Sequence, residues 1–332
     1  MSGAGTIGRI SRVPRGIKPG VINQALIRIR VNKQLVDLEY FLQWMRSEKM
    51  QDKLTQANPA SAMVNLVPMS EVKEWEVSIP TLEEQQKIGD FFKRLDEMIE
   101  LEQRKINKTK ALKNAYLAEM FPAEGERVPK RRFEGFTDEW EVKSLDNVVM
   151  DISDGDWILK EHIFDEGKYR IIQTGNLGVG RYIDNIGNAK YFNEQDFNQL
   201  KANEIFPGDI LISRLAEPAG RTIILPDTGF KMVTSVDIAI IRPDENFDSS
   251  FFMTQMNTQE ILNQINMEVT GTTHKRISRK NLERIQLLVP GVVEQKQIGA
   301  FFKNLDDIIS NQQQRLEKLK STKQAYLHEM FV

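Results

Sequence analysis

The chain has 332 residues, 45 of them basic and 47 acidic, so that the formal net charge at pH 7 is −2, and 40% of the residues are hydrophobic. This length is typical of two or three domains, and a net charge so close to zero argues against a general polyanion binder. The absence of cysteine excludes disulfides, thiolate zinc sites and cysteine catalysis. The three histidines lack the spacing of metal ligands. We therefore expect no metal, no cofactor and no catalytic residue in this chain. No apolar run reaches membrane-spanning length and no signal-peptide core is present, which predicts a cytoplasmic protein without a membrane contact.

Residues 1–79 are predicted to begin with a basic segment. No acidic residue precedes Asp37, whereas seven basic residues do: Arg9, Arg12, Arg15, Lys18, Arg28, Arg30 and Lys33. A second basic cluster occurs at residues 274–280. Such clusters suit contacts with phosphates. Solvated faces without a special function are the alternative.

Residues 80–122 predict one long helix. Its apolar residues recur at alternating steps of four and three, which is the seam of a coiled coil: Ile88, Phe92, Leu95, Ile99 and Ile106. A helix of about forty residues is roughly 60 Å long. An ordinary core helix is the alternative, and the charged outer face favours a paired rod.

Residues 123–140 are predicted to be a linker and residues 141–289 a complete α+β domain. Short apolar runs between turn residues indicate strands at 169–173, 210–213, 221–225 and 236–241. The apolar spacing at residues 251–266 indicates a single helix.

The first segment aligns with only part of this domain. Residues 8–9, 25–30 and 39–54 correspond to residues 220–221, 238–242 and 251–266. Nothing before Met1 matches residues 140–214. We therefore expect residues 1–79 to be a partial copy of the second domain, with a small complete domain of another type as the alternative.

Residues 290–332 repeat the first helix. About half of the residues between 290 and 331 are identical to those between 80 and 121. The seam recurs at Ile298, Phe302, Leu305, Ile309 and Leu316. A repeat separated by a large insert indicates two copies arranged about a pseudo-two-fold axis, so we expect the two seams to pair as an antiparallel coiled coil.

The order of segments and the repeated motif carry a family resemblance. Residues 80–89 and 290–299 share Pro, Glu-Gln and Ile-Gly at matching positions, residues 206–211 contain Gly-Asp-Ile-Leu, and residues 132–140 contain Arg-Phe, Gly-Phe and Trp. The chain resembles the specificity subunits of Type I restriction-modification systems. The resemblance covers nearly the whole chain, and it implies that the first of two target recognition domains lacks its initial part.

This resemblance implies a function in reading DNA. Each target recognition domain of that family reads one half of a bipartite site in double-stranded DNA, and the paired helices hold the two domains at a fixed separation. Methyltransferase subunits bind the helix ends, and a restriction or translocase subunit joins them. Adenine methylation and DNA cleavage are then expected in those partners and not in this chain.

The candidate DNA contacts lie in residues 141–289. One set combines hydroxyl donors with a basic run, which suits phosphate positioning and base-edge contacts: Thr272, Thr273, His274, Lys275 and Arg276. Gln173 and Asn176 end a predicted strand and could reach an adenine edge, with an Asx-type turn as the alternative. Further candidates are Arg181, Arg214 and Arg221, for which a role in solubility is the alternative.

Other classes of function remain open. A nuclease would pair Asp227 or Asp244 with Glu294, but Glu294 begins a long helix and the sister copy lacks the accompanying lysine. A coiled-coil scaffold that binds no DNA is a second alternative. A truncated inactive copy, or a recombination-reservoir copy, of a specificity subunit is the third.

Overall fold

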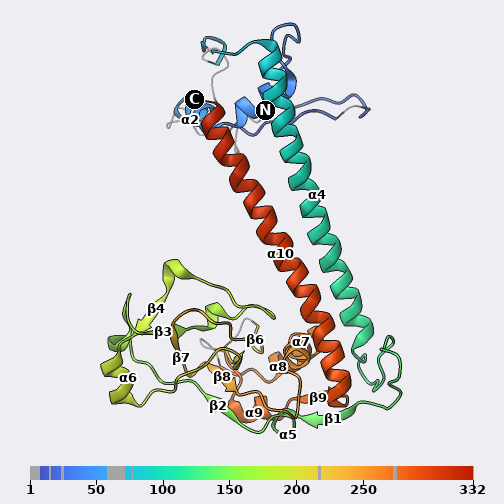
Figure 1. Cartoon of the computed structure of the whole chain (residues 1–332), viewed down its shortest axis with the longest axis vertical. Coiled ribbons are helices and arrows are strands. Elements are labelled where there is room, and N and C mark those ends of the chain that lie inside the picture. Colours follow the sequence, from blue (N-terminus) through green and yellow to red (C-terminus); the bar gives the residue numbers. More distant parts are fainter. Residues whose placement is uncertain are drawn as a thin grey trace. The chain divides into compact units, whose positions relative to one another are not determined.

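The computed structural model describes residues 8–14, 16–23, 26–57, 72–76, 78–215, 218–271 and 275–331 (Figure 1). The chain divides into two compact units. Unit 1 comprises residues 1–108 and 309–332, and unit 2 comprises residues 109–308. Each of the two long helices contributes one part to each unit. None of the helices in the described ranges combines the length and apolar character of a membrane-spanning segment.

Unit 1 is mainly helical. It contains α1 (Leu38–Arg46), α2 (Glu48–Gln56), the first part of α4 (Leu82–Met120) and the last part of α10 (Val292–Met330). Asp37 caps α1, because its carboxylate accepts a hydrogen bond of 2.9 Å from the Tyr40 N–H. The buried Tyr40 ring packs against Phe331, with 5.4 Å between ring centroids. This contact fastens α1 to the end of α10.

The segment before α1 leaves apolar surface exposed. Among the described residues from 8 to 37 there is no strand, and seven large apolar side chains are exposed: Val13, Ile17, Val21, Ile22, Leu26, Ile29 and Leu35. Arg15 and Ala25 lie outside the described residues. The strand of unit 2 that aligns with residues 25–30, β8 (Ile238–Ile241), is fully buried between two neighbours. Among the described residues of the first globular part, no strand corresponds to β8.

Unit 2 contains three sheets and short helices. Strands β2 (Ile152–Asp154), β8, β5 (Ile210–Ser213) and β6 (Thr222–Ile224) form an antiparallel sheet in that order. The second sheet has the order β4 (Lys190–Phe192), β3 (Tyr169–Ile172), β7 (Lys231–Thr234), and β1 (Glu141–Ser144) pairs with β9 (Gln286–Val289). The helices are α5 (Leu145–Val148), α6 (Glu194–Leu200), α7 (Ser249–Met256), α8 (Gln259–Met267) and α9 (Arg279–Glu283). Single 3-10 turns lie at Lys160–His162, Thr174–Asn176 and Ile186–Asn188.

The four-stranded sheet is buried on both faces. Along β5, Ile210 and Ile212 point into a core with α7 and α8, whereas Leu211 points into a second core on the opposite face. Because strand side chains alternate, a strand with both faces covered reads as a continuous apolar run. This confirms the strands predicted near residues 169–173, 210–213, 221–225 and 236–241.

The single helix predicted at residues 251–266 is wrong, because α7 and α8 are separate helices. Asn257 interrupts them: its side-chain amide donates to the Thr222 carbonyl at 2.7 Å and accepts from the Thr222 N–H at 3.1 Å. Thr258 then caps α8. The helix expected at 39–54 is likewise broken at Ser47. The two globular parts therefore share the break as well as the sequence pattern.

The repeated Gln and Gly of the two long helices form the same joint in each unit. In unit 1, the buried Gln85 side chain accepts from the Asp37 N–H at 2.9 Å and donates to the Pro80 carbonyl at 2.9 Å. In unit 2, Gln295 accepts from the Asp248 N–H at 3.0 Å and donates to the Pro290 carbonyl at 2.9 Å. The glutamine thus fixes the start of its long helix to the capping residue of a domain helix.

Gly299 completes the joint in unit 2, since a Cβ atom there would lie 2.7 Å from the Phe251 nitrogen and would overlap the Asp248 carboxylate. At an open helix position, Gly→Ala would add about 1 kcal/mol of stability. We expect Gly299→Ala to do the opposite and lower stability by about 1–3 kcal/mol through overpacking. The measurement is thermal or urea unfolding. Gly291→Ala, with no atom within 4 Å of its added Cβ, is the control, and an increase in stability of Gly299→Ala would contradict this role.

The long helices run antiparallel, so the start of one meets the end of the other. In unit 1, Lys323 on α10 binds Asp96 on α4 at 2.6 Å. In unit 2, the equivalent pair Lys113 and Asp306 is 2.5 Å apart. The buried carboxylate of Glu102, on the seam, lies 3.3 Å from the Lys105 ammonium and 4.0 Å from the Arg315 guanidinium.

The predicted seam residues lie on the paired faces. Phe92, Ile106, Ile298, Phe302, Leu305, Ile309 and Leu316 are buried, and Ile88, Leu95 and Ile99 are partly buried. The clusters join Phe92 to Leu327 and Phe331, and Phe302 to Met120 and Phe121. The two seams were expected to pair as an antiparallel coiled coil. In such a pair each helix start lies against the other helix's end, so seam residues near one start contact residues near the other end.

Candidate nucleic-acid interface

The polar ends of three strands meet at one edge of the four-stranded sheet. Strand β2 ends at Asp154, β5 is followed by Arg214, and β8 is preceded by Asp237. Because β8 runs antiparallel to both neighbours, these three residues converge. The Arg214 N–H donates to the Asp237 carbonyl at 2.8 Å, and the Arg214 carbonyl accepts from the Ile277 N–H at 3.0 Å. The segment after residue 275 is thereby held against this edge.

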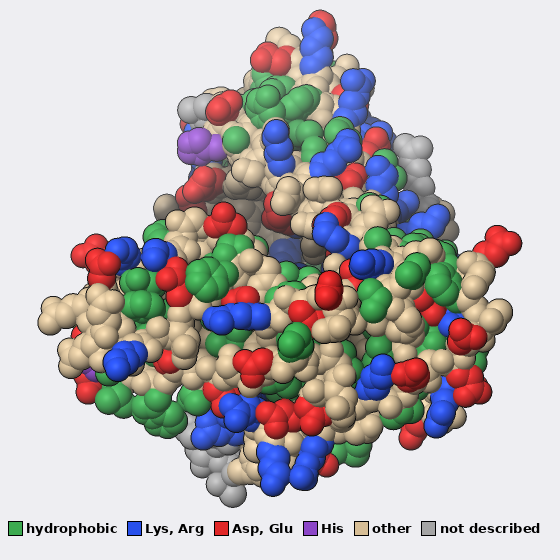
Figure 2. Space-filling view, turned by 60° about the horizontal axis from the view of Figure 1, so that its bottom comes forward, with side chains coloured by type: hydrophobic (Ala, Val, Ile, Leu, Met, Phe, Trp, Pro, Cys, Tyr) green, Lys and Arg blue, Asp and Glu red, His purple; other side chains and the backbone are tan. Residues whose placement is uncertain are grey.

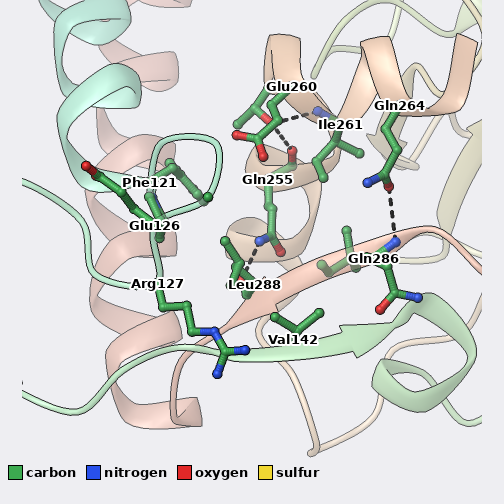
Figure 3. Close-up of a pocket in the computed structure, with 14 residues that line it drawn as sticks. Phe121, Glu126, Arg127, Val142, Gln255, Glu260, Ile261, Gln264, Gln286 and Leu288 are labelled. Carbon is green, nitrogen blue, oxygen red and sulfur yellow. Dashed lines mark hydrogen bonds between the residues drawn. The ribbon is translucent and has the colours of Figure 1, made fainter. Parts of the chain in front are cut away.

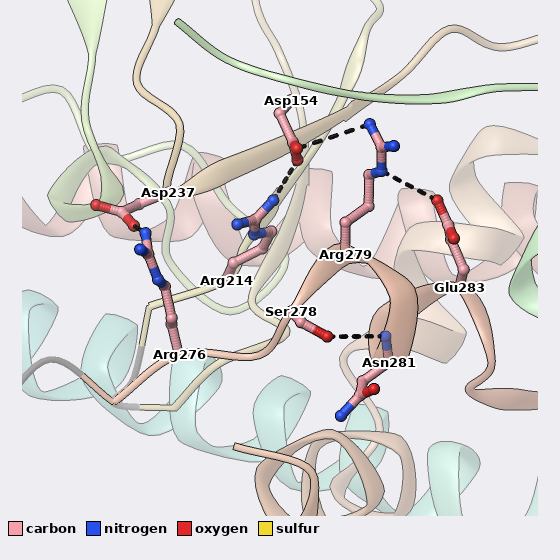
Figure 4. Close-up of polar contacts among 8 residues, drawn as sticks. All are labelled: Asp154, Arg214, Asp237, Arg276, Ser278, Arg279, Asn281 and Glu283. Carbon is pink, nitrogen blue, oxygen red and sulfur yellow. Dashed lines mark hydrogen bonds and ion pairs between the residues drawn. The ribbon is translucent and has the colours of Figure 1, made fainter. Parts of the chain in front are cut away.

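Three arginines and three carboxylates gather here, and we call them the arginine cluster: Arg214, Arg276, Arg279, Asp154, Asp237 and Glu283 (Figure 4). Arg214 is buried and bonded to Asp154. Arg276 binds Asp237 at 2.9 Å. Arg279 lies 3.7 Å from Asp154 and 3.2 Å from Glu283. Each guanidinium is therefore oriented by a carboxylate.

The three arginines differ in the exposed fraction of their side chains. The side chain of Arg214 is 8% exposed, whereas those of Arg276 and Arg279 are 42% and 49% exposed. A guanidinium has five N–H donors, so a carboxylate on one edge leaves the other edge available. That free edge suits a phosphate or the O6/N7 edge of guanine. The guanidinium groups of Arg276 and Arg279 are thus accessible at the surface, whereas that of Arg214 is enclosed.

The other predicted contact residues fall into two groups. Thr272, Thr273 and His274 lie outside the described residues. Lys275, Gln173 and Arg181 are exposed. The side chains of these three residues remain available as contacts, and Lys275 directly precedes Arg276 of the arginine cluster.

The side chains of Asn176 and Arg221, both candidate DNA contacts, are engaged within the protein, and for Asn176 this argues against the expected adenine-edge contact. The buried Asn176 amide accepts from the Gln173 N–H at 2.9 Å and donates to the Ile183 carbonyl at 2.9 Å. The Arg221 guanidinium donates to the Leu177 carbonyl at 2.8 Å, and burial lowers its pKa. Both side chains direct their donors to backbone carbonyls, so the Asx-type turn kept as the alternative for Asn176 describes it better.

Charge is mixed over the surface. Figure 2 shows Lys and Arg side chains interspersed with Asp and Glu side chains over the visible face. Charged side chains of the described residues pair in many places, for example Lys190 with Asp165 at 2.5 Å and Lys231 with Glu204 at 3.3 Å. A face of this kind does not act as a broad positive field. DNA contact would depend on a few placed donors.

A pocket of about 350 Å³ lies between the end of α4, α8 and β9 (Figure 3). Its polar groups are already bonded to each other: Gln255 donates to the Leu288 carbonyl at 2.5 Å, and the Gln264 side chain accepts from the Gln286 N–H at 3.1 Å. Burial, with a smaller effect of Glu124, raises the pKa of Glu260 on its wall. The lining offers no group of positioned donors like that of the arginine cluster.

The sequence reasoning missed Asp154, Asp237 and the specific role of Arg279. A partial signal was present, because Asp237 lies near the start of the strand predicted at residues 236–241, whereas no strand was predicted at Asp154. The pairing could not be read from it, since Asp154 and Arg214 are far apart in sequence and meet only through the order of strands in the sheet.

Comparison with known proteins identifies the family. The sequence matches the family described as Type I restriction modification DNA specificity domain over residues 3–111 and 137–321. It is 25% identical to the Type I restriction enzyme MjaIX specificity subunit of Methanocaldococcus jannaschii, covering 97% of this chain and 76% of the relative, and 20% identical to the MjaVIII specificity subunit, covering 94% and 73%. Its fold is similar to the crystal structure of the Type I restriction-modification S subunit from M. genitalium, with a TM-score of 0.62 and 17% identity over 91% of this chain and 74% of that one. The chain therefore belongs to the Type I restriction-modification DNA specificity family.

Proposed function

We propose that this chain is the DNA-reading specificity subunit of a Type I restriction-modification complex. The observation that carries the proposal is the match to a DNA specificity family over both halves of the chain. The recurrence of one joint in both units supports a function that uses two readers. The division into a first reader (1–79), a spacer helix (80–122), a linker (123–140), a second reader (141–289) and a second spacer helix (290–332) is part of this proposal.

The two long helices act as a ruler in this proposal. Each has 39 residues, which corresponds to about 58 Å. Two half-sites read from the same face of DNA lie roughly 34 Å apart, or one helical turn. A stiff helix pair of this length is suited to set that spacing.

The chemistry of the complex belongs to other subunits in this proposal. Methyltransferase subunits would perform adenine methylation and a restriction subunit DNA cleavage, while this chain supplies the contacts to double-stranded DNA. The candidate metal-binding carboxylate of a nuclease, Glu294, is bound by Arg132 at 2.6 and 2.8 Å, which supports a structural role for it. Because the DNA that such a complex reads is in the cytoplasm, we propose the cytoplasm as its location.

In the second reader, Lys275 and Arg276 are the proposed phosphate contacts, together with Thr272, Thr273 and His274 of the same loop. We expect Lys275→Ala together with Arg276→Ala to weaken binding to duplex DNA of any sequence. The slope of log K against log salt should fall by about one unit for each phosphate that is no longer neutralised. The measurement is fluorescence anisotropy of labelled DNA over a salt series, with the chain assembled with its methyltransferase subunit.

Lys190→Ala is the control, because Lys190, on β4, is engaged by Asp165, and the salt slope of this variant should match that of the unmodified chain. A double variant with an unchanged slope would remove this loop from the interface. Binding to the partner without any salt-dependent DNA binding would favour the scaffold alternative. Assembly without sequence-selective binding would favour the truncated, inactive copy.

A further inference from the structure

Trp157 differs from the other tryptophans of the chain in its exposure. All four lie in the described residues: Trp157 is 67% exposed, Trp140 is 1% exposed, and Trp44 and Trp75 are partly buried. Exposure alone is not evidence of a function, because single apolar side chains occur on most protein surfaces. The position of Trp157 and the way its backbone is held distinguish it from such side chains.

Hydrogen bonds fix the backbone directly before Trp157. The Asp156 N–H donates to the Thr234 carbonyl at 2.8 Å, and the Asp156 carbonyl accepts from the Val236 N–H at 2.9 Å. The Asp156 carboxylate accepts from the backbone N–H and the side-chain amide of Asn203 at 2.7 and 3.0 Å. The segment that carries the indole ring is therefore bonded to two other parts of the domain.

The residues around Trp157 also keep its ring on the outside. Ile158, the next residue, packs against the core that contains Tyr169 and Phe192. On the other side, Gly155 lies so close to the connection between β7 and β8 that a Cβ atom would be 2.3 Å from the Ser235 carbonyl oxygen. A ring held between two anchored residues loses little backbone freedom when it binds a partner. Trp157 is thus preorganised as a contact.

Two segments connect Trp157 to the arginine cluster (Figure 4). On its own side, the Asp154 carboxylate, three residues earlier, lies 3.7 Å from the Arg279 guanidinium. The connection between β7 and β8, to which the preceding residue is bonded, contains Asp237, and Asp237 binds Arg276 at 2.9 Å. The indole ring and two accessible guanidinium groups are therefore carried by segments that meet at one edge of the four-stranded sheet.

We propose that Trp157 is a specificity-determining residue of the second reader, whose ring contacts the 5-methyl group of a thymine in the major groove of DNA. This inference deepens the proposed function and depends on it. The thymine methyl group is apolar and distinguishes an A·T pair from a G·C pair, so it is suited to an indole ring. The arginines of the same edge supply contacts of another kind, to phosphates or to guanine.

A partner protein is the other kind of surface that suits an exposed tryptophan. The neighbouring groups favour DNA, because the centres of protein interfaces are depleted of charged residues, whereas the segments beside Trp157 carry three arginines and three carboxylates. Arginines with accessible guanidinium edges are, in contrast, the commonest readers of DNA.

The first experiment selects bound sequences from a pool of randomised duplexes, with the chain assembled with its methyltransferase subunit. W157A should lose the preference for one A·T pair in one half of the selected sequence. It should bind that sequence about tenfold more weakly, as expected for one lost base contact, with the affinity for unselected DNA and the salt slope unchanged. W157F keeps an aromatic ring and should retain most of the preference.

The control for this selection is I186A. Ile186 is 74% exposed, so its replacement removes a comparable exposed apolar side chain. It lies in the turn before β4, which is separated from β7 by β3 in the second sheet. I186A should select the same sequence as the unmodified chain, with the same affinity.

The second experiment replaces each thymine of the selected sequence in turn by deoxyuridine, which removes only the methyl group. One replacement should weaken binding of the unmodified chain about fourfold, the effect of burying one methyl group, and should leave binding of W157A unchanged. If W157A selects the same sequence as the unmodified chain, or if no deoxyuridine weakens binding, the methyl contact is wrong and the proposed function stands. If the unmodified chain selects no sequence at all, both fail. Weaker assembly of W157A with the methyltransferase subunit, with its selected sequence unchanged, would place the ring at a protein interface and overturn the inference.

Discussion

Replacing Glu294 by glutamine is expected to lower the free energy of unfolding of unit 2 by about 3–5 kcal/mol. Glu294 is 1% exposed and receives two hydrogen bonds from Arg132, and removal of one partner leaves the other charge buried without compensation. The hydrogen bonds that Arg132 donates to Glu294 raise the pKa of Arg132, and without that carboxylate the guanidinium still keeps its proton, because arginine is not deprotonated in proteins. Chemical unfolding with amide exchange resolved by unit is the measurement.

Glu84→Gln provides a matched control inside the same protein. Glu84 occupies the same position of its helix, so the interaction with the helix dipole, at most about 1 kcal/mol, is removed in both variants. Among the described residues Glu84 has no arginine partner, and its variant should change stability by no more than that amount. If the two substitutions prove equally damaging, the Arg132–Glu294 pair does not stabilise unit 2 in the way inferred from the contacts.

Leu305→Asp is expected to disrupt the helix pairing in unit 2. Leu305 is buried in the cluster with Phe302 and Met120. Removal of a buried leucine side chain costs about 2–5 kcal/mol, and a carboxylate at that place adds a desolvation penalty. Lys113, the nearest interhelical cation, is already engaged by Asp306. Leu95→Asp should act in the same direction in unit 1, with a smaller effect because Leu95 is only partly buried. The melting temperature and amide exchange along α4 measure both variants.

Ile308→Asp and Met98→Asp are the controls for this prediction. They lie three residues further along the same helices and are exposed, so each should leave the melting temperature nearly unchanged. If Leu305→Asp and Ile308→Asp behave alike, the buried seam does not hold the helices together.

The repeat made the scaffold predictable from sequence. Glu84-Gln85 and Glu294-Gln295, with the seam around Phe92 and Phe302, indicated two long helices in antiparallel contact, and the structure contains them. The strands were found where both faces are buried, as at residues 210–213, because such strands read as continuous apolar runs. The local sequence pattern was sufficient to predict a helix or strand wherever the contacts that determine it are made by residues close in sequence.

The remaining features depend on partners distant in sequence. Asn257 ends a helix because it bonds to β6, and no local periodicity reports that contact. Asn176 was a plausible base contact by residue type, but its amide is occupied by backbone groups. The carboxylates that orient Arg214 and Arg276 reach them only through the sheet order. Side-chain chemistry indicated which residue types are suited to contact DNA. The topology of the sheet determined which of those side chains are engaged by other groups of the protein and which are not.

The joint of Gln85 with Asp37, repeated by Gln295 with Asp248, has a consequence for how such a gene can vary. Each globular part is fastened to its long helix through one capping aspartate, one glutamine and one glycine. Residues of the globular part that contact neither this joint nor the long helices, unlike Tyr40 and Phe251, are free to diverge without disturbing that attachment. A genetic exchange that inserted an unrelated globular sequence ending in the same aspartate-capped helix would fit the old scaffold at once. Target preference could then change in a single inheritance step while the assembly around it stayed the same.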